Sequence, residues 1–441
     1  MNNRKLRTGL FSTVILSLLF SPVLHSQTGN AGDSLSLEYI IKEAVTTHPT
    51  VRAAEEAVRN ADARIGLART GYYPEADVTA GYSNLGPVTK LTIPDMGTFQ
   101  LFPENNYSAA VNYRQVVYDF GRTRQNIEIE TENKYIGEQA LEQVKQKLSL
   151  YAVNNYFSLL FLQSAIKIKE EQIATLNEHL RQVEKMMATG SSTEYQVLAT
   201  KVRISVAESQ KVDLLAGLAA QQAAMNSLLG NDNSLMPVVK SRLRADMPMI
   251  PRDSIFSFAY HNRDEALLNE KKISLAELRY GMAKIQNRPV ISFQASAGAK
   301  NGYVPYLNEI KPNYVVGLAL RIPVFDGLKT KYNVLQAQSA INSLSYESES
   351  TRRTISNELL ESEAYIEAAE KKVTQFELQM EQALKAYSLA ETSFRSGMVT
   401  NLDLLDANSA VSESRLLMLK ARIDYAASIY KLKAALGERL Y

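Results

Sequence analysis

Two carboxylates are the side chains of this sequence whose spacing is best suited to chemistry. Asp403 and Asp406 lie three residues apart in the stretch SGMVTNLDLLDA, which covers residues 396–407. In a helix this spacing places both side chains on one face. Such a pair can cap a helix, bind a cation, carry out acid–base catalysis or set the charge of a pore. The surrounding sequence distinguishes between these roles.

The composition argues against nucleic-acid binding and against thiol or metal chemistry. The 441 residues carry 49 Lys and Arg and 47 Asp and Glu, so a net charge of +2 offers no excess of basic groups to a polyanion. The sequence contains no cysteine, and its four histidines are not clustered. It also lacks nucleotide-binding loops and nucleophile motifs. We therefore expect neither an enzyme nor a cofactor, and a metal at Asp403 would lack a third ligand type.

The first residues have the pattern of an export signal. Three basic residues precede the apolar run 9–20, and Ser26 is a small residue at the expected cleavage position. The run is short for a transmembrane helix, although an uncleaved anchor is the alternative. The sequence predicts a signal peptide over residues 1–26 and an exported chain.

The remaining sequence contains one unit twice. An offset of 207 residues superimposes Arg114 on Arg321, and upstream an offset of 215 residues superimposes Pro74 on Pro289. The eight extra residues of the first copy fall in the interval 84–105, whose Gly and Pro residues predict a loop.

The duplication gives the domain boundaries. We expect a first repeat at 35–230, a linker at 231–252 and a second repeat at 253–437. Each repeat contains two strands, a long helix and a return helix. The expected ranges are strands at about 75–84 and 106–118 with helices at about 123–189 and 193–230, then strands at about 290–299 and 313–323 with helices at about 329–396 and 400–437.

The long helices are predicted by the lack of proline and by the spacing of apolar residues. From Ile355 to Phe394 apolar residues recur in alternating steps of four and three, which is typical of helices in a left-handed coiled coil. A continuous helix over 123–189 would be about 100 Å long. That length suits a structure that crosses a wide space.

Each long helix should end in a tight turn. Gly190 and Gly397 occupy the position just past a helix C-terminus, where glycine is common. Thr193 and Thr400 then suit the N-caps of the returning helices. Each copy is thus expected to form a long helical hairpin.

The predicted strands alternate apolar and polar residues over about ten positions. This pattern matches transmembrane barrel strands, and a half-buried soluble sheet gives the same alternation. Because four strands cannot close a barrel and open edges are not tolerated in lipid, a membrane role would require several chains to pool their strands. Arg114 and Arg321 recur on the polar face, where they face a barrel lumen or anchor the strand ends.

With these elements in order, the chain resembles the TolC-like outer membrane efflux proteins. The resemblance rests on VYDFG at 117–121, VFDG at 324–327, FRSG at 394–397 and DLLDA at 403–407, in their duplicated arrangement. It implies a mainly α fold with a small transmembrane β part. Three chains would form a homotrimer with a 12-stranded β-barrel in outer-membrane lipid and a periplasmic α-helical barrel. A periplasmic adaptor (membrane fusion) protein and an inner-membrane transporter would be the partners.

The resemblance also implies roles for the helix tips. Asp403 and Asp406 match the acidic pair that narrows the family's tunnel entrance, so six carboxylates would form the pore gate. Their crowding should raise some of their pKa values and attract cations. A capping role for Asp403 within Thr400-x-x-Asp403 is the alternative, and it leaves Asp406 unexplained. The expected adaptor-docking residues are Gly190, Thr193, Gly397 and Thr400.

The predicted function is an outer membrane channel-tunnel that exports small molecules, such as drugs, toxic compounds or metals. One alternative is the outer membrane duct of a type I protein secretion system, because the inner-membrane pump would set the substrate. The other is a periplasmic coiled-coil scaffold that forms no channel. The alternating strands argue against the scaffold, which needs no lipid-facing sheet.

Overall fold

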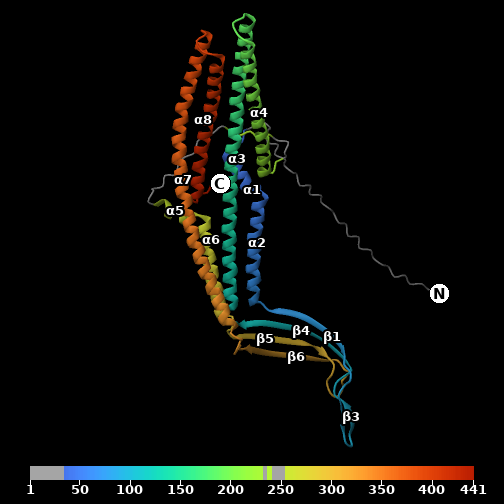
Figure 1. Cartoon of the computed structure of the whole chain (residues 1–441). Coiled ribbons are helices and arrows are strands. Elements are labelled where there is room, and N and C mark those ends of the chain that lie inside the picture. Colours follow the sequence, from blue (N-terminus) through green and yellow to red (C-terminus); the bar gives the residue numbers. More distant parts are fainter. Residues whose placement is uncertain (1–33, 232–235, 241–253) are drawn as a thin grey trace, which may run out of the picture.

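Two very long helices run along the molecule. In the computed structural model, which describes residues 34–231, 236–240 and 254–441, α3 (Arg122–Ala188) and α7 (Lys329–Arg395) have 67 residues each. Their return helices are α4 (Glu194–Leu229) and α8 (Asn401–Ala435). The helices form one end of an elongated molecule and a small sheet forms the other (Figure 1). The predicted signal peptide at 1–26, and most of the predicted linker, lie outside the described residues.

Shorter helices accompany the half of each long helix that is nearer to the sheet. They are α1 (Leu37–Thr47), α2 (Pro49–Arg69), a 3-10 turn at Thr70–Tyr72, α5 (Ile255–Asn262) and α6 (Asp264–Ile285). The chain breaks between α1 and α2 because Pro49 cannot continue a helix but suits its first position. The His48 side chain accepts a hydrogen bond from the Thr50 backbone N–H and so caps α2.

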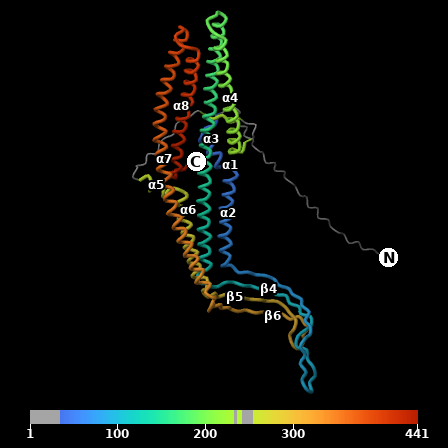
Figure 2. The backbone as a smooth tube through the Cα atoms, in the orientation of Figure 1, coloured from blue at the N-terminus to red at the C-terminus, as the bar shows by residue number. Residues whose placement is uncertain are grey.

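The helices form an open layer four elements wide. Near the tips the order across the layer is α4, α3, α8, α7, and near the sheet it is α2, α3, α6, α7 (Figures 1 and 2). In both halves α3 of the first repeat contacts a helix of the second repeat. Among the described residues, α2 or α4 forms one margin of this layer and α7 the other, and the short helices α1 and α5 are their only additional helical neighbours.

The sheet has the same four-element organisation. Its strands β1 (Glu75–Asn84), β4 (Asn105–Tyr118), β5 (Val290–Lys300) and β6 (Lys311–Arg321) are antiparallel in that order. Strand β6 contains Pro312, which an edge strand tolerates because its unpaired side needs no N–H donor.

The first strand pair carries an additional hairpin. Strands β2 (Lys90–Ile93) and β3 (Gly97–Gln100) pair with each other inside the interval 84–105. The sequence prediction of a plain loop there is wrong. Two strands of four residues, separated by a turn that begins at Pro94, are too short to give a clear period-two pattern.

The pairing register separates the sheet into an apolar and a polar face. Val78 pairs with Val111, Val111 with Ala297, and Ala297 with Tyr314, so these four residues share one face. Three of them are large and exposed: Val78, Val111 and Tyr314. The alternation predicted from the sequence is therefore present, and its apolar side is uncovered in the single chain.

The main core lies halfway along the molecule, where α1, α3, α4 and α8 contribute side chains to one apolar cluster. Ile40, Tyr156, Leu159 and Met225 are almost completely buried there. The Tyr156 hydroxyl donates a hydrogen bond to the Lys240 carbonyl at 2.6 Å, which satisfies its polar end. This cluster holds the two hairpins together at their roots.

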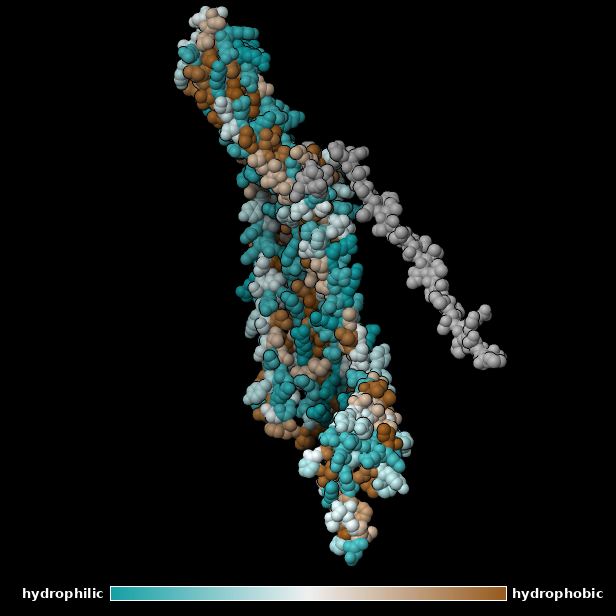
Figure 3. All heavy atoms as spheres, turned by 90° about the vertical axis from the view of Figure 1, so that its right-hand side faces the viewer, coloured by the Kyte–Doolittle hydropathy of each residue, from teal (hydrophilic) through white to brown (hydrophobic). Residues whose placement is uncertain are grey.

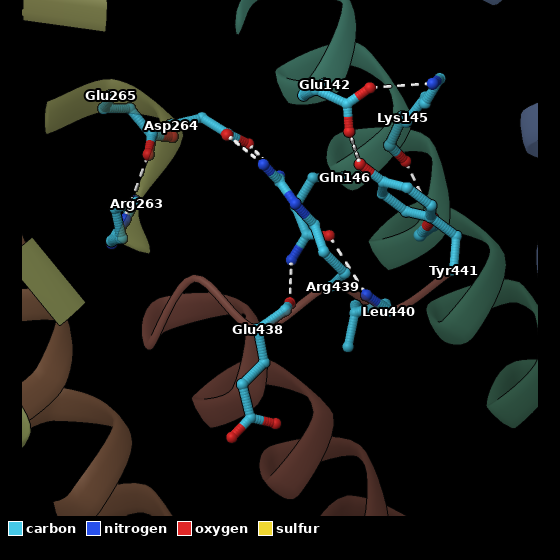
Figure 4. A network of polar contacts seen from close by, with 11 residues as sticks. Glu142, Lys145, Gln146, Arg263, Asp264, Glu265, Glu438, Arg439, Leu440 and Tyr441 are labelled. Carbon is cyan, nitrogen blue, oxygen red and sulfur yellow. Dashed lines mark hydrogen bonds and ion pairs between the residues drawn. The ribbon is translucent and has the colours of Figure 1, made fainter. Parts of the chain in front are cut away.

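A polar network beside this core connects α3, α6 and the residues that follow α8 (Figure 4). Arg439 donates two hydrogen bonds to the buried carboxylate of Asp264, at 2.6 and 2.8 Å. The Tyr441 hydroxyl donates to Glu142 on α3. Because a buried carboxylate is stable only with paired donors, the bidentate arginine fixes α6 against the end of α8.

Candidate pore entrance at the helix tips

Both hairpins turn on a glycine in the left-handed conformation. Gly190 has φ of 77° and Gly397 has φ of 76°. At the first tip, the Ser191 N–H donates to the Met186 carbonyl at 2.8 Å, and at the second the Met398 N–H donates to Ser393 at 2.9 Å. This is the Schellman arrangement, which satisfies carbonyls that the helix end leaves open.

The return helices start differently in the two copies. Thr193 and Thr400 are both N-caps, but the Thr193 side chain makes no capping hydrogen bond. Thr400 forms a complete capping box: its hydroxyl accepts from the Asp403 N–H at 3.2 Å, and the Asp403 carboxylate accepts from the Thr400 N–H at 2.8 Å. The predicted capping role of Asp403 is thus present in the single chain.

The capping contacts also act on the charge of Asp403. The Thr400 hydroxyl donates to the Asp403 carboxylate at 2.6 Å. This bond, followed by the one from the Thr400 backbone N–H, lowers the pKa of the Asp403 carboxyl below its usual range. Asp403 is therefore ionised at neutral pH.

Asp406 has a different partner. Its carboxylate accepts a hydrogen bond from the Arg203 guanidinium on α4 at 2.6 Å, and the pair forms a salt bridge between the two hairpins. The side chains remain 39% (Arg203) and 58% (Asp406) exposed, so solvent screens the pair. The sequence offers no local signal for this contact, because 203 residues separate the two positions.

The two carboxylates lie on the open side of α8. Asp403 and Asp406 are exposed, whereas Leu404 and Leu405 between them are buried against the other helices. Leu404 packs with Val183, and Leu405 with other residues of the tip. The structure thus brings the two predicted gate residues onto one exposed surface near the second tip.

A buried polar cluster that the sequence analysis missed joins the hairpins above these residues. The His179 imidazole Nε2 lies 2.6 Å from the Asn401 amide oxygen, and the Asn401 amide nitrogen donates to Thr200 at 3.3 Å. His179 and Asn401 are nearly fully buried. The three residues come from α3, α8 and α4, so the cluster fixes the start of α8 against the first hairpin. Their separation in sequence hides this arrangement.

The two predicted lumen residues lie on the same face of the sheet. Arg114 pairs with Gln294 and Arg321 with Val290, and these two β5 residues are four positions apart, which puts them on one side. Both arginines are exposed. The same face carries Asn112, whose amide donates to Asp77 at 3.0 Å. This face is the polar one.

The described residues contain neither a membrane-spanning helix nor a cluster of metal ligands. No helix there is both long enough and apolar enough to span a membrane. In those same ranges, no group of three or more His, Asp or Glu side chains is arranged to hold a metal ion.

A protein-family model described as "Outer membrane efflux protein" matches residues 40–231 and 263–438. The chain belongs to this family. One matched segment falls on each of the two repeats. This efflux protein is an outer-membrane channel for export, and its large helical part lies in the periplasm.

The relatives and the solved structure described next each match most of this chain. This efflux protein is 21% identical to the alkaline protease secretion protein AprF of Pseudomonas aeruginosa, over 76% of this chain and 70% of the relative. It is 19% identical to the outer membrane efflux protein BepC of Brucella suis, over 93% and 87%. The crystal structure of the outer membrane protein VceC from Vibrio cholerae superimposes with a TM-score of 0.76 and 17% identity, covering 92% of this chain and 97% of that one.

Proposed function

We propose that three copies of this efflux protein form a closed ring that exports small molecules, such as drugs, toxic compounds or metals. A periplasmic adaptor and an inner-membrane pump would deliver the substrate. The observation that carries the proposal is that, in the described part of the chain, each layer ends in an open edge on both sides, apart from the short helix α5, which contacts α7. Near the tips the edges are α4 and α7, near the sheet α2 and α7, and in the sheet β1 and β6.

The two edges of each layer are unlike. One always belongs to the first repeat and the other to the second. Copies that join such edges head to tail form heterologous contacts, which generate a ring when the rotation closes. One rotation can then close all three layers together. The number three is taken from the family resemblance, and it gives twelve strands.

The sheet also favours a closed ring, because its edges and its apolar face are uncovered in a single chain. Its strands have 10 to 14 residues, which suits a tilted strand that spans a bilayer. Its apolar face is exposed in the single chain and would contact lipid. Unpaired strand edges are costly in lipid, so β1 of one copy would pair with β6 of the next.

The edge helix α4 carries a matching apolar stripe. Tyr195, Leu198, Val202 and Val206 are exposed at spacings of three and four residues, so they lie along one flank. Figure 3, which views the molecule from the α4 side, shows apolar patches along this end. Such a stripe suits a neighbouring helix, and in the ring that helix is α7 of the next copy.

In this ring the tips would have the roles that the resemblance implies. Asp403 and Asp406 of three copies would surround the narrow entrance, where crowded carboxylates favour cations. Arg114 and Arg321 would face the barrel lumen. The adaptor would dock on the turns formed by Gly190, Thr193, Gly397 and Thr400.

A second candidate is the duct of a type I protein secretion system. It is favoured by the similarity to a relative named for alkaline protease secretion. Deletion of the gene separates the two candidates. Small-molecule export predicts increased sensitivity to toxic compounds, whereas protein secretion predicts loss of a protein from the culture medium with unchanged sensitivity.

Mass measurement in detergent tests the assembly. We expect three chains per particle and ion conductance when the particle is added to a planar bilayer. A stable folded monomer, or a particle without conductance, would overturn the ring. The non-channel scaffold predicts the second of these results.

A further inference from the structure

The β2–β3 hairpin has one apolar and one polar face. We call residues 90–100 the outer hairpin. Leu91 pairs with Phe99 and Ile93 with Gly97, which places three large apolar side chains on one face. The Thr92 and Thr98 hydroxyls bond to each other across the opposite face at 2.9 Å. Leu91, Ile93 and Phe99 remain 48%, 36% and 47% exposed.

The start of β4, which follows the outer hairpin, is anchored by side-chain contacts, whereas the apolar face of the hairpin itself remains exposed. The Asn301 side chain donates to the Asn105 carbonyl at 2.7 Å and accepts from the Tyr107 N–H at 2.8 Å. The hairpin projects beyond the end of the sheet that is far from the helices (Figure 1). A two-stranded hairpin is only marginally stable in water unless its apolar face is covered. This chain leaves that face open.

The loop between β5 and β6 carries a second uncovered apolar surface at the same end of the sheet. Within this second-repeat loop, residues 301–310, Val304 is 73% exposed, Tyr306 60% and Ile310 63%. These exposed fractions already include any coverage by the outer hairpin of the same chain. Neither apolar surface is therefore covered by other residues of the same chain.

The directions of β1 and β6 would place the outer hairpin of one copy near the loop 301–310 of the next. Strand β1 runs toward the far end and leads into the outer hairpin, and β6 starts at that end directly after the loop 301–310. In the proposed ring, on which this step rests, β1 of one copy lies beside β6 of the next. The outer hairpin of one copy then lies beside the neighbour's loop.

We propose that the apolar face of the outer hairpin is a docking surface for the loop 301–310 of the neighbouring copy. Leu91, Ile93 and Phe99 would pack against Val304, Tyr306 and Ile310 of that copy. The contact would close the seam between copies at the outer mouth of the channel, beyond the last β1–β6 hydrogen bonds. The threonine face would stay in water.

Cysteine cross-linking between differently tagged copies tests the contact, since the natural chain contains no cysteine. One copy carries Phe99→Cys and the other Val304→Cys, and the mixed complex is treated with a short bis-maleimide. We expect a covalent dimer that contains both tags. Thr98→Cys, which lies next to Phe99 on the opposite face, is the matched control and should give at least fivefold less of this dimer.

Three other outcomes would overturn the inference. One is an intact three-chain particle without Phe99–Val304 cross-links, which leaves the ring proposal standing. Another is cross-linking between Phe99→Cys copies alone, which would mean that the hairpins meet each other at the centre. The third is equal cross-linking from Thr98→Cys. A monomer in detergent would instead refute the ring itself.

Discussion

At the residue scale, we expect the negative charges of Asp403 and Asp406 to affect ion selectivity and cation block. Replacing both residues with alanine should lower cation preference and weaken block by multivalent cations, because the carboxylates that attract cations are removed. Single-channel recording at low salt is the appropriate measurement, since screening is weakest there.

Glu194→Ala provides the control for this pair. Glu194 is an exposed acid in the first turn of α4, close to the other tip, and it is not a predicted gate residue. Its removal should leave selectivity close to that of the parent. Unchanged selectivity in an assembled Asp403→Ala, Asp406→Ala variant would exclude both residues from the gate and leave Asp403 with its capping role alone.

Asp119 should make stability depend on pH. Burial raises the pKa of its carboxyl, but hydrogen bonds from Thr123 and Gly121 and the charge of Arg122 outweigh burial and lower it. A lowered pKa stabilises the folded state above the unfolded value of about 3.9, and the benefit is lost as pH falls. Asp119→Asn keeps one acceptor oxygen but removes the charge, so it should cost about 1 kcal/mol at pH 7, the difference between hydrogen bonds to a charged and to a neutral acceptor. The difference from the parent should shrink below pH 4.

Thermal unfolding followed by circular dichroism in detergent measures this effect. Thr123→Ser keeps the hydroxyl that donates to Asp119 at 2.5 Å and should retain the pH dependence. Thr123→Val should reduce it. An equal stability difference at pH 7 and pH 3 for Asp119→Asn would contradict the assignment.

At the scale of elements, the second tip depends on the backbone of Gly397. A φ of 76° is costly for a β-branched residue, whereas asparagine tolerates it. Gly397→Val should distort the turn and impair export, and Gly397→Asn should retain most export. Export assayed in cells and particle mass in detergent are measured together. Loss of the particle, rather than of export alone, would mean that the turn serves only assembly.

The elements themselves were largely predictable because local chemistry defines their ends. Gly190 and Gly397 end the long helices. Because the unit occurs twice in the sequence, a prediction made for one repeat could be checked against the other. Helix α3 spans Arg122–Ala188, where the sequence predicts about 123–189. Strand β6 ends at Arg321 instead of 323, because Pro323 has no N–H for the ladder.

The contacts at the tips could not be predicted in the same way. Asp403 has its partner three residues away, so its capping box is visible in the sequence. Asp406 bonds to Arg203, and His179 to Asn401, from different repeats. Such pairs depend on how the hairpins pack, and no local pattern encodes that packing.

At the scale of the whole molecule, the repeat predicts how neighbouring copies pair. Inside the chain, Asn112 of β4 lies opposite Ser296 of β5. The repeat offsets of 207 and 215 residues convert this pair into Ala319 of β6 and Gly81 of β1. If the seam between copies repeats the seam within a copy, Ala319 lies opposite Gly81 of the next copy.

Paired cysteines check this register. Copies that carry Ala319→Cys and Gly81→Cys should form a disulfide in the assembled particle. Leu320→Cys with Gly81→Cys should not, because neighbouring residues of a strand point to opposite faces. Stronger cross-linking of the Leu320 pair would show that the seam is shifted by one residue.

In the proposed ring, the Arg203–Asp406 salt bridge would make the charge of the entrance depend on how far the helices at the tips move apart. While α4 and α8 stay in contact, the guanidinium offsets the charge of Asp406, one of the two carboxylates that each copy would contribute. A movement that draws α8 away from α4 breaks this pair and leaves Asp406 uncompensated. The entrance would then become more negative as it dilates, so a dilated channel would discriminate against anions more strongly than a constricted one.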